Sequence, residues 1–192
     1  MGFLLSTIVG AVSDANKLVK QNKAQNDDTT QNVVVSGKFA IDVPSFLSPM
    51  KNLNEDASLQ YGSRALDISF IVIDEPKSEF TQSLEELQAE LPSVFGDNKS
   101  ALDSMATIVL CNMFDIEKVE LAGRKETQIN GLNALILNAF QKRTFLKDAL
   151  YGSFAFIEGK DTIYQIIVLS GGTSITKLSD KLEKSIFSFR EL

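Results

Sequence analysis

The chain has 192 residues, enough for one domain of ordinary size with a sizeable buried core. Hydrophobic residues make up 44% and charged residues 23%, which excludes a collagen, a coiled-coil rod and a wholly disordered chain. The 25 Asp and Glu outnumber the 19 Lys and Arg, giving a formal net charge of −6. This balance argues against nucleic-acid binding, because neutralisation of phosphates supplies most of that affinity.

Histidine is absent, which removes several kinds of chemistry. Without an imidazole there is no Ser-His-Asp or Cys-His nucleophile pair, and most zinc and copper sites are excluded. The sequence therefore indicates neither a metal nor another cofactor. The single cysteine, Cys111, follows the apolar run 108–110, and we expect it to be a buried, inert thiol.

Residues 1–32 differ in composition from the rest of the chain. Residues 1–12 carry no charge and place apolar side chains at helical spacing, whereas residues 16–32 are polar. We expect an amphipathic helix over about residues 3–22, followed by a disordered polar linker to residue 32. The apolar stretch is too short to span a bilayer. Three interpretations stay open: the helix docks on the domain or a partner, residues 1–22 contact a membrane or direct export, or the segment is foreign to the natural protein.

From Val33 onward the pattern predicts a single domain, residues 33–192, that is rich in strands. The expected elements, in chain order, are strands over 38–43, 57–61 and 66–73, helices over 78–91 and 100–113, strands over 124–128, 132–140, 151–157 and 162–169, and a helix from residue 174. Asn130-Gly131 is a strong signal for a tight hairpin turn, and residues 158–161 predict a second hairpin.

The strands over 132–140 and 162–169 are apolar on both faces. In the first of them, Leu135 and Leu137 alternate with Ala134 and Ile136. Tight turns make neighbouring strands antiparallel, and two apolar faces both need cover. The predicted fold is therefore α+β: an antiparallel sheet covered by helices on both faces, an α/β/α sandwich.

Two segments resemble the PsbP-like superfamily, including its DcrB-like bacterial branch. Residues 37–44 (Gly-Lys-Phe-Ala-Ile-Asp-Val-Pro) resemble the opening strand of that family, and residues 128–134 (Gln-Ile-Asn-Gly-Leu-Asn-Ala) resemble its mid-domain turn. The resemblance covers about residues 33–192; one departure is Phe46-Leu47, where relatives often place a Trp. It implies the α/β/α fold and a non-enzymatic binding or adaptor role, and it carries over no functional residue.

Two surfaces are candidate binding sites. The first is the polar connector after Pro49, because loops held by a rigid sheet often carry binding residues. Its candidate residues are Asn52, Asn54, Glu55, Asp56, Gln60 and Tyr61. The second is the acidic outer side of the helix over 78–91, a docking surface for a basic partner, with candidates Glu85, Glu86 and Glu90.

The predicted function is a non-catalytic binding or adaptor module with a protein partner. One alternative is a carboxylate-dependent hydrolase, which needs two Asp or Glu side chains facing each other roughly 5–10 Å apart. The inward-facing strand positions contain no such pair. A second alternative is a membrane-tethered structural protein of the cell envelope, which depends on residues 1–22. The sequence leaves the compartment open between the cytoplasm and the membrane or envelope.

Overall fold

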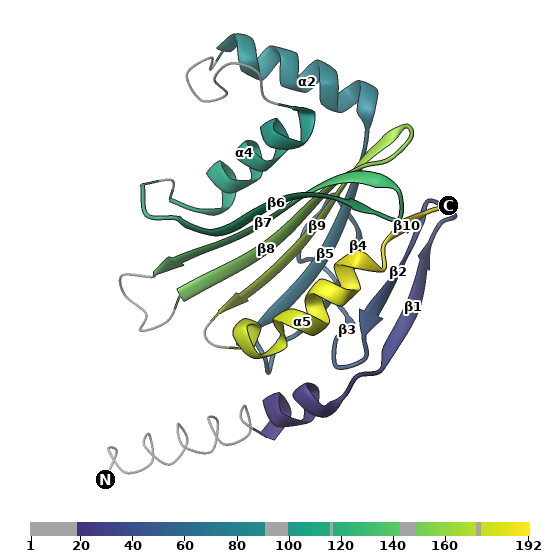
Figure 1. Ribbon diagram of the computed structural model, residues 1–192, viewed down its shortest axis with the longest axis vertical. Coiled ribbons are helices and arrows are strands. Elements are labelled where there is room, and N and C mark those ends of the chain that lie inside the picture. Colours follow the sequence, from purple (N-terminus) through teal and green to yellow (C-terminus); the bar gives the residue numbers. More distant parts are fainter. Residues whose placement is uncertain (1–18, 91–99, 116, 143–148, 172–173) are drawn as a thin grey trace.

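The computed structural model describes residues 19–90, 100–115, 117–142, 149–171 and 174–192. Within these ranges the chain forms two antiparallel sheets and the helices α2 (Lys77–Glu90), α4 (Ala101–Met113) and α5 (Ser174–Phe187) (Figure 1). A further helical segment covers residues 19–26.

The large sheet has seven strands in the order β3-β4-β5-β9-β8-β7-β6. Their bounds are β3 (Ser48–Pro49), β4 (Ala57–Ser63), β5 (Ile68–Pro76), β6 (Glu120–Ile129), β7 (Leu132–Lys142), β8 (Ala149–Glu158) and β9 (Thr162–Gly171). Strands β6 to β9 form an antiparallel meander, while β5 and β9 pair over their full length although they lie far apart in the sequence. This pairing joins the two halves of the domain at the centre of the sheet.

The small sheet has the order β1-β2-β10, with β1 (Thr30–Val35), β2 (Phe39–Pro44) and β10 (Arg190–Glu191). The strand β2 lies in the middle, so the C-terminal residues pair with one of the first strands of the chain. The opening strand predicted over 38–43 is thus observed as β2.

The predicted turn between β6 and β7 is confirmed. Asn130 and Gly131 both have positive φ, 48° and 86°, the backbone that a two-residue hairpin of matching twist requires. The register then runs from Ile129↔Leu132 to Glu120↔Phe140, with a bulge between Leu121 and Gly123.

Each face of the large sheet carries its own hydrophobic core. Helices α2 and α4 cover one face, where Phe80 and Met105 pack against Phe154 and Phe156. Helix α5 and the small sheet cover the other face (Figure 1). The predicted α/β/α sandwich is therefore confirmed, with the addition that a second, three-stranded sheet shares one of the two layers with α5.

Helix α4 begins at a capping box. The Ser100 side chain accepts a hydrogen bond from the Asp103 backbone N–H, and the Asp103 carboxylate accepts one from the Ser100 backbone N–H. Two backbone donors of the first turn are satisfied in this way.

Cys111 is exposed, and the prediction of a buried thiol is wrong. Its neighbours Val109 and Leu110 are buried in the second core. One residue further along a helix turns the side chain by about 100°, which carries Cys111 out of the apolar face. The helical period therefore decides its exposure, not the apolar run that precedes it.

The N-terminal boundaries also differ from the prediction. Residues 30–32 belong to β1, although their polar composition predicted a linker to residue 32. They pair with Asp42–Pro44, and an edge strand tolerates polar side chains because one of its sides faces water. The helical segment at 19–26 extends past residue 22, and the predicted helix before residue 19 lies outside the described residues. Among the residues that are described, none of the helices has the length and hydrophobicity to cross a membrane.

Candidate functional site

The connector between β3 and β4 is held in shape by two of the predicted binding residues. The Gln60 side-chain oxygen accepts hydrogen bonds from the backbone N–H groups of Leu53, at 2.7 Å, and Asn54, at 3.3 Å. The Asn54 side-chain oxygen accepts one from the backbone N–H of Asp56 at 2.8 Å. Gln60 and Asn54 therefore shape the loop through their side-chain oxygens, which accept these hydrogen bonds.

The other candidates in this loop have different positions. Asn52 is exposed and has a φ of 63°, a left-handed conformation that asparagine adopts more readily than most residues. Tyr61 is half-buried and packs against the first core. Glu55 and Asp56 are exposed at the far end of the loop. Of the six predicted residues, Asn52, Glu55 and Asp56 present exposed side chains to a partner.

The structure brings the loop next to the beginning of α2. Burial and the negative charges of Glu79 and Asp56 together raise the pKa of the Glu75 carboxyl. Glu75 is the second-last residue of β5, Glu79 lies in the first turn of α2, and Asp56 comes from the loop before β4. Three carboxylates from three segments thus share one local field.

The pKa of the neighbouring Asp74 carboxyl is shifted in the opposite direction. Burial raises its pKa, but hydrogen bonds from Lys38 and Ser58 and the charge of Lys38 outweigh this, so the pKa lies below its usual range. The Lys38 Nζ and an Asp74 carboxylate oxygen are 2.6 Å apart. Because successive strand residues point to opposite faces, Asp74 is paired on one face and Glu75 joins the acidic group on the other.

The acidic side of α2 continues this negative surface. Glu79, Glu86 and Glu90 are exposed and fall within about 40° of one another around the helix, since each residue turns it by 100°. Glu85 is also exposed but lies about 100° away from Glu86. Two of the three predicted docking residues therefore share a stripe with Glu79. We call Asp56, Glu75, Glu79, Glu86 and Glu90 the acidic surface.

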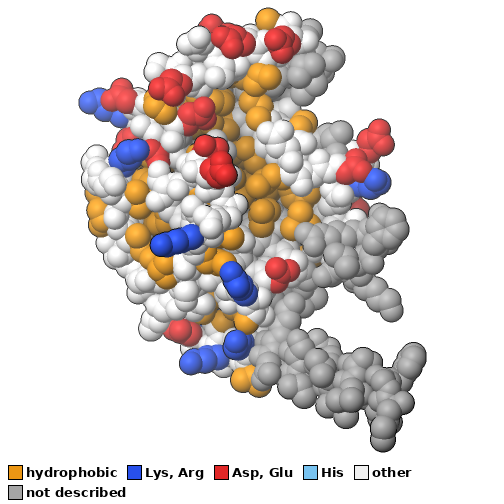
Figure 2. Space-filling model, turned by 180° about the vertical axis from the view of Figure 1, so that it is seen from behind, with side chains coloured by type: hydrophobic (Ala, Val, Ile, Leu, Met, Phe, Trp, Pro, Cys, Tyr) orange, Lys and Arg blue, Asp and Glu red, His pale blue; other side chains and the backbone are white. Residues whose placement is uncertain are grey.

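Half-exposed apolar side chains lie beside the acidic surface. Leu53, Ala57, Ile73 and Leu87 pack against the second core while keeping part of their surface in water, and we call them the apolar strip. Ala57 and Ile73 are direct cross-strand partners. Figure 2 shows acidic side chains beside exposed hydrophobic groups in the upper part of the molecule, and Lys and Arg side chains both there and further down.

A second concave surface lies on the opposite face of the large sheet. It is a groove of about 330 Å³ between α5 and the strands β6, β7 and β8. Its lining is mainly apolar, with Ile136, Phe140, Tyr151, Leu182 and Ile186 among the residues that form it. No local pattern in the sequence predicts this groove, because its walls come from segments about 50 residues apart.

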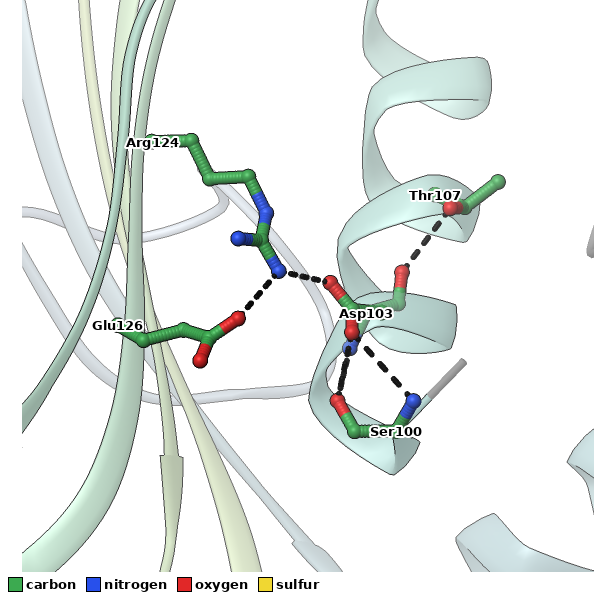
Figure 3. Close-up of polar contacts among 5 residues, drawn as sticks. All are labelled: Ser100, Asp103, Thr107, Arg124 and Glu126. Atoms are coloured by element: carbon green, nitrogen blue, oxygen red, sulfur yellow. Dashed lines mark hydrogen bonds and ion pairs between the residues drawn. The ribbon is translucent and has the colours of Figure 1, made fainter. Parts of the chain in front are cut away.

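A polar cluster fixes α4 to the edge strand β6 (Figure 3). The Arg124 guanidinium donates to Asp103 at 2.7 Å and to Glu126 at 2.8 Å. Burial raises the pKa of Asp103, but the hydrogen bonds from Arg124 and Ser100 outweigh it and the pKa lies below its usual range. Every charged group in this cluster has a partner, so its contribution is structural.

No Asp or Glu of the described residues lies in the buried interior. The buried polar residues of the described chain are Gln21, Ser104, Ser170 and Ser185, and none of them is a carboxylic acid. Within the same residues, no group of three or more Cys, Asp or Glu is placed to hold a metal ion. Asp56 and Glu79 are exposed and Glu75 is half-buried, and the like charges of the three carboxylates repel one another.

No family model matches the chain, and no curated protein matches it. Several solved structures do match the chain. The Ran-binding protein Mog1p of Saccharomyces cerevisiae has a TM-score of 0.56 at 12% identity, covering 84% of this chain and 95% of Mog1p. Cyanobacterial PsbP (CyanoP) of Synechocystis sp. PCC 6803 has a TM-score of 0.51 at 9% identity, covering 86% and 94%. The chain has the PsbP-like fold. The predicted resemblance is thereby confirmed at the level of the fold, since identities this low show nothing further.

Proposed function

We propose that this PsbP-like domain is a non-catalytic adaptor, and that the acidic surface and the apolar strip bind a protein partner through a basic, amphipathic segment. The observation that supports this most is the grouping of Asp56, Glu75 and Glu79. Like charges held together raise the free energy of the unbound protein, and a cationic partner relieves that repulsion on binding.

The apolar strip adds binding affinity that charge alone does not supply. Charged groups accelerate association and select the partner, whereas burial of apolar area supplies much of the affinity. Leu53, Ala57, Ile73 and Leu87 offer such area directly beside the carboxylates. The complementary ligand is a segment with Lys or Arg on one side and Leu, Ile or Val on the other.

The fold comparison agrees with a binding role without specifying it. Mog1p is a Ran-binding protein, so the same fold supports protein recognition in at least that case. For the present chain, the partner class rests on the charge and apolar character of its own surface.

A defined probe tests the proposal. An 18-residue amphipathic peptide of Lys and Leu is titrated into ¹⁵N-labelled protein, and the amide shifts are followed. We expect the shifts to map to α2, β5 and the loop 50–56, and the affinity to fall about tenfold or more between low and moderate salt.

Two matched triple variants distinguish the effect of the acidic surface on peptide binding from the effect of the protein's net charge. Glu79→Gln, Glu86→Gln and Glu90→Gln together should weaken binding of the peptide about tenfold at low salt. The control is Glu117→Gln, Glu120→Gln and Asp180→Asn, which changes the net charge equally at exposed positions elsewhere. Equal affinities of the two variants, or shifts that map to another face, would show that this surface is not the binding site.

A further inference from the structure

Three adjoining hollows lie at the end of the described chain that is opposite α2. Their volumes are about 220, 610 and 440 Å³. The first and the second share Lys20 and Ser63, and the second and the third share Lys51 and Arg64, so they form one continuous concave surface. The helical segment 19–26, which contributes to this surface, and α2 lie at opposite ends of the described chain (Figure 1).

Four exposed cationic side chains line this surface, and we call it the basic hollow. They come from three separate segments: Lys20 and Lys23 from the helical segment, Lys51 from the loop after β3, and Arg64 from the turn after β4. None of the four forms an ion pair with another described residue. In a chain with a net charge of −6, these cations are thus gathered at one end without a counter-ion from the described protein.

Two carboxylates also line the basic hollow, but they do not neutralise it. Asp27 accepts a hydrogen bond from the backbone N–H of Thr29, at 3.0 Å, and another from the Thr29 hydroxyl. The Asp67 carboxylate lies against Gly171 of β9, in the space that a Cβ at that position would need. Four cations against two carboxylates leave the hollow with a net positive charge.

The acidic surface is too distant to neutralise the basic hollow. Strand β5 runs between the two: Glu75 lies near its α2 end, and Ile68 lines the hollow at its other end. The residue steps between them span roughly 23 Å along a strand. This distance is more than twice the Debye length of about 8 Å at physiological ionic strength, so the two surfaces act on ligands independently.

Uncharged hydrogen-bond donors complete the lining. They are the hydroxyl groups of Ser45, Ser48 and Ser63 and the side-chain amide of Asn52. Within the part of the chain that the structure describes, these side chains have no hydrogen-bond partner. Ammonium, guanidinium, hydroxyl and amide groups are the donors that phosphate oxygens accept from. The cations are spread over adjoining hollows, which suits a ligand with several anionic groups better than a single small anion.

We propose that the basic hollow binds a ligand that carries two or more phosphate groups. Arg64 supplies a planar fork of donors for phosphate oxygens, and Lys20 and Lys51 supply point charges on either side of the second hollow. The inference does not depend on the acidic surface or on the function proposed for it. Such phosphate groups belong either to a soluble polyphosphate or to the headgroups of anionic lipids, and the experiments below distinguish these two sources.

Tripolyphosphate is the soluble probe. It is titrated into the ¹⁵N-labelled full chain at constant ionic strength, and the amide shifts are followed. We expect shifts in residues 20–23, 45–52 and 62–67 and none in α2, with an affinity that falls about fivefold or more between low and moderate salt. Shifts that map to another face, or no binding at low salt to either this probe or the anionic vesicles described below, would overturn the proposal.

Two matched double variants test whether the hollow or the overall charge attracts the probe. Lys20→Gln with Lys51→Gln should weaken tripolyphosphate binding about fivefold or more. The control is Lys142→Gln with Lys160→Gln, which removes the same charge at exposed positions outside the hollow and should leave the affinity within about twofold of the wild type. Equal losses in the two variants would show that no specific site exists.

Vesicle flotation distinguishes the two sources of phosphate. Vesicles of phosphatidylcholine alone are compared with vesicles that also contain cardiolipin, a lipid with two phosphates. Flotation only with cardiolipin, abolished by Lys20→Gln with Lys51→Gln and by free tripolyphosphate, would assign the site to lipid headgroups. Binding of tripolyphosphate without flotation would assign it to a soluble ligand.

Sedimentation velocity tests the remaining occupant, the acidic surface of a second copy. We expect the chain to sediment as a monomer at low salt. Oligomers that dissociate in moderate salt and are absent in Lys20→Gln with Lys51→Gln would show that a second copy fills the basic hollow, and would overturn the proposal.

Discussion

The C-terminus of the chain is fastened by a buried phenol whose ionisation should be visible in both spectroscopy and stability. The Tyr164 hydroxyl donates to a carboxylate oxygen of Glu191 at 3.0 Å, and that carboxylate also accepts from the backbone N–H of Lys160 at 2.9 Å. The Tyr164 ring contacts Phe39 and Phe189 in the first core. Burial and the Glu191 carboxylate raise the pKa of Tyr164 from 10.0 to about 12.

The raised pKa of Tyr164 predicts how the free energy of unfolding changes at alkaline pH. The folded pKa lies above the unfolded value, so the stabilisation is fully present below pH 10 and is lost as pH rises toward 12. Each pKa unit corresponds to about 1.4 kcal/mol, so the free energy of unfolding should fall by roughly 2–3 kcal/mol over this interval because of Tyr164 alone. The unfolded chain releases the proton first, and this draws the equilibrium toward unfolding.

The variant Tyr164→Phe isolates that contribution. At pH 7 it loses the hydrogen bond to a charged acceptor, and we expect a cost of about 1.5–3 kcal/mol. Between pH 10 and 12 the variant should lose less stability than the wild type, so the two curves of unfolding free energy against pH converge.

Urea unfolding at pH 7, 9, 10 and 11 measures the curves, and the absorbance of phenolate near 295 nm follows ionisation. Tyr151→Phe, at a half-buried position on the same sheet, is the control for losing one tyrosine. Parallel pH dependence of the wild type and Tyr164→Phe, together with no phenol that titrates near pH 12, would refute the assignment.

Three other substitutions give separate outcomes. Arg124→Met should cost about 1 kcal/mol at pH 7, because the guanidinium is half-exposed. The pKa of Asp103 lies below its usual range, so this stability is present above the ordinary carboxyl pKa and is lost as pH falls through the folded value. In urea unfolding, the difference between the variant and the wild type should therefore shrink steadily as pH is lowered from 5 toward 2, and a difference that stays constant would contradict the ion pair's role. Leu182→Ala, at a side chain that is 2% exposed, should cost about 2–5 kcal/mol in the same assay; a cost below 1 kcal/mol would show that α5 is loosely packed. Glu75→Gln should raise the free energy of unfolding at pH 7 and leave it unchanged near pH 3, because the raised pKa of Glu75 means that the folded state opposes its ionisation. Equal effects of the substitution at both pH values would show that charge repulsion is not the cause.

Much of the fold follows from local sequence signals. Alternating apolar residues on both faces of 132–140 and 162–169 predicted strands that need cover on two sides, and both cores confirm this. Asn130-Gly131 predicted the tight turn because few other residue pairs accept two positive φ values, and both are observed. The helix predicted over 100–113 is observed as α4, which begins after Ser100, whose hydroxyl accepts a hydrogen bond from the backbone N–H three residues later.

The candidate site was only partly predictable. The sequence singled out Glu86 and Glu90 on the acidic helix, and their spacing of seven and eleven residues from Glu79 is a signal that helical periodicity could have used. Gln60 and Asn54 were predicted to bind a partner, and that stays a prediction; the structure adds that their side-chain oxygens accept hydrogen bonds from the backbone of their own loop. Polar composition alone does not say whether an amide faces a partner or its own chain.

The sequence by itself determined where the helices and the longer strands of the large sheet form, because periodicity and turn residues act over fewer than about a dozen neighbouring positions. The tertiary structure decided which segments meet. Asp56 and Glu75 come together only because β4 pairs with β5, and the groove beside Leu182 exists only because α5 packs across strands that precede it by dozens of residues. Long-range contacts depend on how the apolar faces of all the elements pack at once, and no local pattern in the chain encodes that arrangement.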